Sequence, residues 1–113
     1  MPKSAWMLAT VAAGVLLTGC WSTACQDLAT AYAGVDQKAR PCLERAPLPA
    51  FDPDRCEQNL QACTGQDIPR LEAQVECYQR LGTCQPEQKA AFLQSITDCD
   101  SLVLSNACEA AIF

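Results

Sequence analysis

The sequence predicts an all-α fold, a small disulfide-rich bundle of short helices, and three observations lead to this prediction. Apolar residues recur every three or four positions between the aspartate, proline and glycine residues that are typical of helix ends. No stretch shows the sustained alternation of β-branched and polar residues that a sheet requires. Nine cysteines in 113 residues indicate that covalent bridges, more than a large apolar core, hold the chain together.

The first predicted helix begins at Ser22 or Thr23, either of which is a suitable N-cap, and ends at Gly34. Its apolar face carries Cys25, Leu28 and Tyr32. Pro41 prevents simple continuation of a helix, because proline lacks the backbone N–H. The Ala-Pro-Leu-Pro-Ala segment at 46–50 is expected to be a stiff connector.

Two further helices are predicted over residues 53–64 and 68–81. At the start of each, an aspartate comes shortly before a proline, and a glycine follows the end of each. These residues are Asp52 and Pro53, Asp67 and Pro69, and Gly65 and Gly82. A disulfide between the two helices is therefore geometrically possible if the chain turns back on itself between them.

The C-terminal part of the chain is also predicted to be helical. One helix begins at Pro86 and carries Phe92, Leu93 and Ile96, and Asn106 with Glu109 resembles a capping box for a short terminal turn. The apolar C-terminal residues 109–113 are expected to pack into the core, because the chain has few large apolar residues to spare. Docking of a partner is the alternative.

The cysteines are regularly spaced. Cys42, Cys63 and Cys84 are 21 residues apart, and so are Cys56 and Cys77. This spacing predicts a degenerate repeat of about 21 residues as the unit of the fold. The alternative is that the equal spacings arise by chance, because many cysteines in a short chain produce some equal spacings.

An oxidising compartment is expected to pair eight of the nine cysteines into disulfides. These eight are Cys25, Cys42, Cys56, Cys63, Cys77, Cys84, Cys99 and Cys108. Two residues seven positions apart on one helix are separated by about 10.5 Å, more than the roughly 7 Å between Cα atoms that a disulfide spans. Cys56–Cys63 and Cys77–Cys84 are thereby excluded as local bridges. If helices 53–64 and 68–81 form an antiparallel hairpin, Cys56 and Cys77 come level, which predicts the bridge Cys56–Cys77.

Composition narrows the classes of function. The chain has no histidine and a net charge of −5, so catalysis by a histidine base and binding to nucleic acid are both disfavoured. Among the eight cysteines expected to pair, at least six residues separate one cysteine from the next, unlike the close pairs of zinc, iron–sulfur and thioredoxin-like sites, so no metal or cofactor is expected.

Two groups of carboxylates could suggest a glycosidase pair, and the first also suggests calcium; they are Asp52, Asp54 and Glu57, and Asp98 and Asp100. Helix capping and solvation explain these carboxylates better, because so small a domain has little room for a catalytic cleft. We therefore expect no catalytic residue, no enzymatic activity and no small-molecule substrate.

The N-terminus indicates export. Lys3 precedes the apolar run 8–17, which is about half the ~20 residues of a membrane-spanning helix and is typical of a cleaved signal peptide. The residues Leu17-Thr18-Gly19-Cys20 resemble the lipobox of bacterial lipoproteins. This resemblance covers residues 1–20 and implies that the signal peptide 1–19 is removed and that Cys20 carries the lipid anchor. The remaining chain then divides into a tether, 20–24, and a disulfide-rich helical domain, 25–113.

The alternative is an ordinary secretory signal cut after Ser22-Thr23-Ala24, which would release a soluble protein beginning at Cys25. Among bacterial lipoproteins, an aspartate after the lipidated cysteine retains many members in the inner membrane, and this chain has Trp21 there. The resemblance therefore implies attachment to the outer membrane, on its periplasmic or cell-surface face.

The expected function is that of an outer-membrane-anchored lipoprotein acting as a non-catalytic structural or protein-interaction module of the bacterial envelope. The chain is similar in this respect to the small cysteine-rich lipoproteins of some Gram-negative bacteria. Its expected partners are the membrane, through the lipid on Cys20, and another envelope protein. The alternative is a periplasmic inhibitor or immunity protein, because a small acidic body suits the basic cleft of a wall-active enzyme.

Overall fold

A computed structural model describes residues 23–113. The described chain is helical, with no strand, and this confirms the predicted all-α class. Its first helix covers residues 23–39. The other elements are α2 (Pro53–Asn59), the 3₁₀ turn η1 (Leu60–Ala62), α3 (Asp67–Arg80), the 3₁₀ turn η2 (Pro86–Gln88), α4 (Lys89–Asp100) and α5 (Asn106–Ile112).

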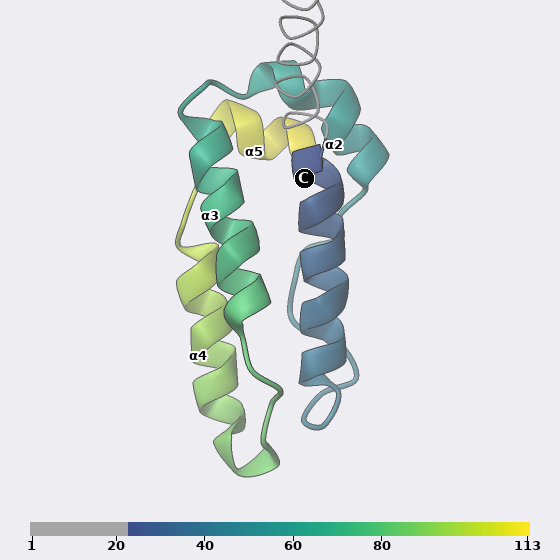
Figure 1. Ribbon diagram of the computed structural model, residues 1–113, viewed down its shortest axis with the longest axis vertical. Coiled ribbons are helices and arrows are strands. Elements are labelled where there is room, and N and C mark those ends of the chain that lie inside the picture. The colour runs from purple at the N-terminus through teal and green to yellow at the C-terminus, as the bar shows by residue number, and fades with distance from the viewer. Residues whose placement is uncertain (1–22) are drawn as a thin grey trace, which may run out of the picture.

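The helices form two groups (Figure 1). The first helix, α3 and α4 run along the length of the domain, whereas α2, η1 and α5 lie together across one end. The helical hairpin of this fold is α3–α4, because these two helices pack side by side and a short connection at the opposite end joins them. The expected hairpin of helices 53–64 and 68–81 is therefore wrong: α2 packs on α5 rather than along α3.

The first helix continues beyond Gly34, where the sequence predicted its end. Val35 and Ala39 are fully buried, so the apolar face extends for another turn and its burial outweighs the lower helix propensity of glycine. The backbone N–H groups of Cys42 and Leu43 both donate to the carbonyl oxygen of Ala39, at 2.8 Å, and close the C-terminus of the helix just after Pro41.

The predicted start of α2 is confirmed, but the α-helix ends at Asn59 and a 3₁₀ turn continues only to Ala62, short of the predicted end at residue 64. The predicted start of α5 shifts by one residue. Asp52 caps α2 as expected, since its Oδ1 accepts a hydrogen bond from the N–H of Asp54 at 2.9 Å. The N-cap of α5 is Ser105 rather than Asn106, and its Oγ accepts from the N–H of Cys108. Glu109 still faces back, but its Oε1 accepts from the N–H of Leu104 at 3.0 Å.

All eight cysteines of the described chain are paired, which confirms a disulfide-rich domain. The bridges are Cys25–Cys56, Cys42–Cys84, Cys63–Cys108 and Cys77–Cys99. The predicted bridge Cys56–Cys77 is wrong, because α2 is carried across the end of the domain, where Cys56 meets the first helix and Cys77 meets α4. The two excluded local bridges are indeed not formed.

The structure does not show the 21-residue repeat. Cys42 and Cys84, which occupy the same position of the proposed repeat, bond to each other, whereas Cys63 bonds to Cys108. Equivalent positions therefore have different surroundings.

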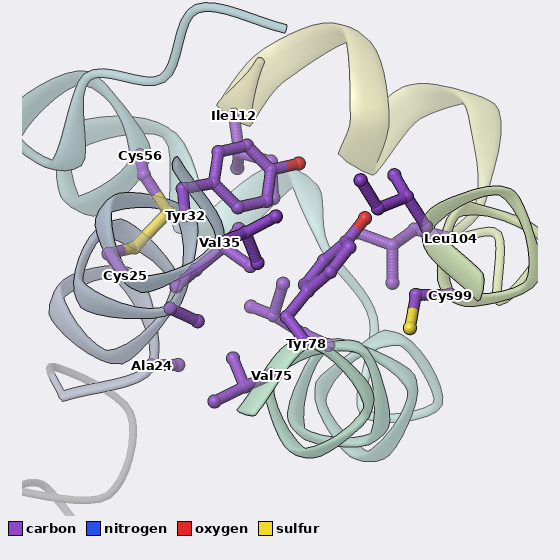
Figure 2. Packing of buried hydrophobic residues seen from close by; sticks show 14 of the residues in the cluster. Ala24, Cys25, Tyr32, Val35, Cys56, Val75, Tyr78, Cys99, Leu104 and Ile112 are labelled. Carbon is purple, nitrogen blue, oxygen red and sulfur yellow. A yellow bond between two sulfur atoms is a disulfide. The ribbon is translucent and has the colours of Figure 1, made fainter. Parts of the chain in front are cut away.

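Side chains from the first helix, α3, α4 and α5 meet in the core (Figure 2). Its largest fully buried side chains include Leu28, Leu71, Tyr78, Ile96 and Ile112. Ile112 confirms that the C-terminal segment packs into the core, and Phe113 packs half-buried against it. Within residues 23–113 no helix has both the length and the apolar character needed to cross a membrane.

Candidate functional site

A pocket of about 570 Å³ opens where the first helix, α3, the end of α4 and α5 come together. Its wall combines aromatic, carboxylate and amide side chains. The residues are Tyr32, Pro49, Gln74, Tyr78, Asp100, Asn106, Glu109, Ala110 and Phe113. They come from five separate segments of the chain, so only the folded domain assembles this pocket.

The aromatic part of the wall is centred on Tyr32. The ring of Tyr78 meets it edge to face at 5.3 Å between ring centroids, and the ring of Phe113 lies nearly parallel to it at 6.4 Å. Figure 2 shows Tyr32 and Tyr78 approaching each other from different helices, with their hydroxyl groups on the same side. The helices thus hold these rings in place, and the pocket needs little rearrangement to present an aromatic surface.

The polar part of the wall combines two carboxylates with amide and hydroxyl groups. The hydroxyl of Tyr78 donates to Asp100, so that carboxylate is oriented by a buried tyrosine. Gln74 is 4 % exposed, and its Nε2 donates to the carbonyl oxygen of Leu102. Its Oε1 is buried and has no hydrogen-bond partner in the described chain. Because a carbonyl oxygen can only accept, the bond to Leu102 fixes which end of the amide is the oxygen.

The two tyrosines are kept in their neutral form. Burial, and further the negative charges of Asp100 and Glu109, raise the pKa of Tyr32 to about 12, although a hydrogen bond with Tyr78 opposes the shift. Burial and the hydrogen bond to Asp100 raise the pKa of Tyr78 even further above its usual value of 10.0. The carboxylates of Asp100 and Glu109 add negative charge to the same wall.

A second buried polar group lies at Asp67, in the first turn of α3. Its Oδ1 accepts from the N–H of Ser105 at 2.9 Å, and its Oδ2 accepts from the Oγ of Ser105 and from the N–H of Thr64, both at 2.8 Å. These hydrogen bonds from the backbone lower the pKa of Asp67 from 3.8 to about 2. Asp67 therefore ties the start of α3 to the segment that leads into α5.

Asp67 also lies beside two sulfur atoms. One carboxylate oxygen of Asp67 and the Sγ atoms of Cys63 and Cys108 lie within 4.8 Å of one another. The two sulfurs are bonded to each other, so neither is the thiolate that a metal would require. This cluster is structural.

The carboxylates singled out in the sequence are not brought together. Asp52 caps α2, and Glu57 accepts a hydrogen bond from the side chain of Gln26 on the first helix at 3.2 Å. Asp98 accepts from Gln94 one turn earlier on α4. Asp100 alone of this set reaches the pocket. No pair of them forms the facing carboxylates that glycoside cleavage requires.

Sequence reasoning missed most of the pocket. Gln74 carried a usable signal, because it lies on the buried face of α3 between Leu71, Val75 and Tyr78, where an apolar residue would be expected. Glu109 was assigned only to a helix cap. Tyr32 and Phe113 were placed in the core or at the C-terminus, and nothing local indicated that they meet.

No protein-family model, curated protein or solved structure matches this chain.

Proposed function

We propose that the chain is an outer-membrane-anchored lipoprotein whose domain serves as a non-catalytic structural or protein-interaction module of the bacterial envelope. The observation that carries the proposal is the number of cysteines that are paired in disulfides. Eight of the nine bond to one another within the described residues, and the ninth, Cys20, is the cysteine of the lipobox-like sequence Leu17-Thr18-Gly19-Cys20. Cys20 itself lies outside the described residues.

The arrangement of the bridges supports a role as a rigid module. They link residues 22 to 45 positions apart, and each helix of the described chain has at least one cysteine in a bridge. Such bridges persist in an oxidising envelope compartment. A domain held in this way loses little conformational entropy when it binds a partner, which lowers the cost of association.

The proposal also sets the position of the domain relative to the membrane. Thr23 and Ala24 are already helical, within the segment 20–24 that the sequence predicts as a tether, and Ala24 is buried. Three residue steps separate Cys20 from Thr23, at most about 11 Å of chain. The bridge Cys25–Cys56 joins this end of the first helix to α2, so in the proposal the end formed by α2 and α5 faces the bilayer.

The test is the intact mass of the full chain expressed in a Gram-negative bacterium and extracted from its membranes, before and after reduction with alkylation. We expect cleavage before Cys20, the mass of acyl chains on that residue, and eight thiols that react only after reduction. The matched control is Cys20→Ala, which removes the lipid site but none of the bridged cysteines. It should lose the acyl mass and membrane attachment yet still yield eight thiols on reduction.

Two outcomes would overturn the proposal in different ways. A soluble species beginning at Cys25 would remove the anchor and favour the alternative of a diffusible periplasmic inhibitor. Thiols that react before reduction would instead contradict the four-bridge framework. Crosslinking of the anchored protein in intact cells then tests the interaction role, and a module without any envelope neighbour within crosslinking distance would contradict it.

A further inference from the structure

The pocket between the first helix, α3 and α5 contains hydrogen-bonding groups that have no partner within the described chain. The hydroxyl of Tyr78 already donates a hydrogen bond to the carboxylate of Asp100, and the Nε2 of Gln74 donates one to the carbonyl oxygen of Leu102. Several acceptors in this wall are open: the Oε1 of Gln74 has no partner within the described chain, and one oxygen each of Asp100 and Glu109 accepts neither the bond from Tyr78 nor the bond from Leu104. The side-chain amide of Asn106 adds both a donor and an acceptor. A ligand with several N–H donors can therefore bond to the open acceptors of Asp100, Glu109 and Gln74.

The charge of the pocket wall also favours a ligand with positively charged N–H donors. Two carboxylates line the pocket, and its lining residues include neither lysine nor arginine. Arg55, on α2, donates from its guanidinium to the carbonyl oxygens of Ala110 and Ala111 at 3.4 Å and is thus bonded to the end of α5. An anion would meet two negative charges here, whereas a cation would be attracted by both of them.

The aromatic rings supply the rest of the recognition. Tyr32 and Phe113 lie nearly parallel with their centroids 6.4 Å apart, and Tyr78 stands edge-on to Tyr32. Ring faces attract cations and also cover apolar stems, which is how aromatic cages bind alkylated ammonium groups. A pocket of about 570 Å³ is large enough for such a group with a short carbon chain.

We propose that this pocket binds the cationic end of an organic ligand, an alkylammonium or alkylguanidinium group, with its stem against Tyr32 and Phe113 and its N–H groups on Asp100, Glu109 and Gln74. The group can belong to a lysine or arginine of a partner protein or to a free amine. The inference goes beyond the proposed function and does not depend on lipidation, because every residue that carries it lies in the described domain.

The test is a titration of the full chain, with its bridges intact and held in a neutral detergent, followed by ¹⁵N–¹H correlation spectra. The probes are butylguanidinium, butylammonium and, as a neutral compound of similar size, n-pentanol. We expect both cations to shift the side-chain amide signals of Gln74 and the backbone signals of α5, with saturation, and we expect the alcohol to bind at least about tenfold more weakly. Added salt should weaken the cations and not the alcohol.

The variants Glu109→Gln and Asp100→Asn remove one charge each and keep an oxygen that can accept the hydrogen bond from Leu104 or from Tyr78. Each should weaken cation binding by about tenfold. The control is Glu72→Gln, which removes one charge from an exposed position of α3 outside this pocket and should change binding less than twofold. Unchanged spectra outside the pocket show that each variant still folds.

A further comparison identifies the source of the cation. An acetylated Gly-Arg-Gly amide that binds as tightly as butylguanidinium assigns the site to a side chain of a partner protein, and a peptide that fails where the free cation binds assigns it to a small amine. Equal binding of the alcohol and the cations, or the absence of saturable shifts with either cation, would refute the proposal. Neither result depends on whether Cys20 is lipidated, so the proposed function is judged separately.

Discussion

Asp67 and Ser105 are joined by two hydrogen bonds across 38 residues of sequence, one from the backbone N–H of Ser105 and one from its hydroxyl. The same carboxylate accepts from Thr64, three residues before it. One buried side chain thus fixes the turn that leads into α3 and also the N-terminus of α5. Protonation of this carboxylate should weaken both parts of the fold together.

The first prediction is a loss of stability in acid that depends on Asp67. Its folded-state pKa lies at about 2, below the ordinary value of 3.8, so the stabilisation is complete above about pH 4 and is lost as the pH falls towards 2. Thermal unfolding followed by circular dichroism should show a melting temperature that decreases over this interval. Asp67→Asn should melt lower at pH 7 and depend less on pH.

The control for this prediction is Asp54→Asn, which removes a carboxylate from an exposed position of α2. It should keep the acid dependence of the parent protein. If Asp67→Asn and Asp54→Asn gave the same pH profile, the hydrogen bonds of Asp67 would not be the origin of the effect.

The second prediction concerns the two tyrosines, Tyr32 and Tyr78, which are the only ones in the chain. In the folded protein neither should ionise near pH 10, because the pKa of Tyr32 is raised to about 12 and that of Tyr78 further still. Their phenolate absorbance at alkaline pH should therefore appear well above pH 11, or only when the chain unfolds. In concentrated guanidinium both should titrate at about pH 10.

The raised pKa values of the tyrosines also determine whether the free energy of unfolding rises or falls with pH. Neutral tyrosine is favoured in the fold, so this stabilisation is complete below about pH 10 and declines as the pH rises further. Tyr78→Phe isolates Tyr32 in the titration and removes the hydrogen bond to Asp100, at a cost of about 0.5–1.5 kcal/mol. A folded protein with a phenolate signal at pH 10 would contradict the buried pair.

The helices could be predicted from sequence where local chemistry determines them. Asp52 followed by Pro53 begins α2, and both the α3 and α4 segments were found because caps and apolar spacing are properties of neighbouring residues. The all-α class followed from the same signals. The boundaries moved where burial competed with propensity, as it does beyond Gly34.

The orientation of the helices could not be predicted in the same way. Whether α2 folds back along α3 or crosses to α5 depends on Asp67 meeting Ser105 and on Cys63 meeting Cys108, and these contacts join residues 38 and 45 positions apart. The pocket, too, is formed by contacts between residues that are far apart in the sequence. Tyr32, Gln74 and Phe113 lie on three elements whose relative placement is decided only by tertiary contacts, so no spacing in the sequence could reveal it.

The third prediction tests the extended first helix. Gly34 lies inside it, with open space where a Cβ would be, so Gly34→Ala should stabilise the protein by about 0.5–1 kcal/mol. The matched change, Ala33→Gly at the exposed neighbouring position, should destabilise by a similar amount, about 0.5–1 kcal/mol. Urea unfolding measures both. Were the helix to end at Gly34, the two substitutions would not have opposite effects of similar size.

The fourth prediction is the disulfide pattern, which peptide mapping without reduction can resolve. Trypsin should release Cys42 and Cys84 as one linked pair of short peptides, 39–45 with 81–89, because it cuts after Lys38, Arg45, Arg80 and Lys89 but not before Pro41. The other bridges remain in one linked group after trypsin. Cleavage after Glu57 separates Cys56 from Cys63, and cleavage before Asp100 separates Cys99 from Cys108.

After these additional cuts, Cys25 should be found with Cys56 and Cys77 with Cys99. Detection of Cys56 with Cys77 would instead require α2 to lie along α3, and α5 would then lose the helix on which it packs.

Removing one bridge completely, with Cys42→Ala and Cys84→Ala together, should lower the free energy of unfolding by about 2–5 kcal/mol. That bridge closes 42 residues and ties the loop after the first helix to the loop after α3, where Lys38 also donates to the carbonyl oxygen of Gln79 at 2.9 Å. The double variant should therefore loosen the end of the domain that lies opposite α2 and α5 first, and faster amide hydrogen exchange at Cys84 to Gln88 than at α5 would locate the loss there.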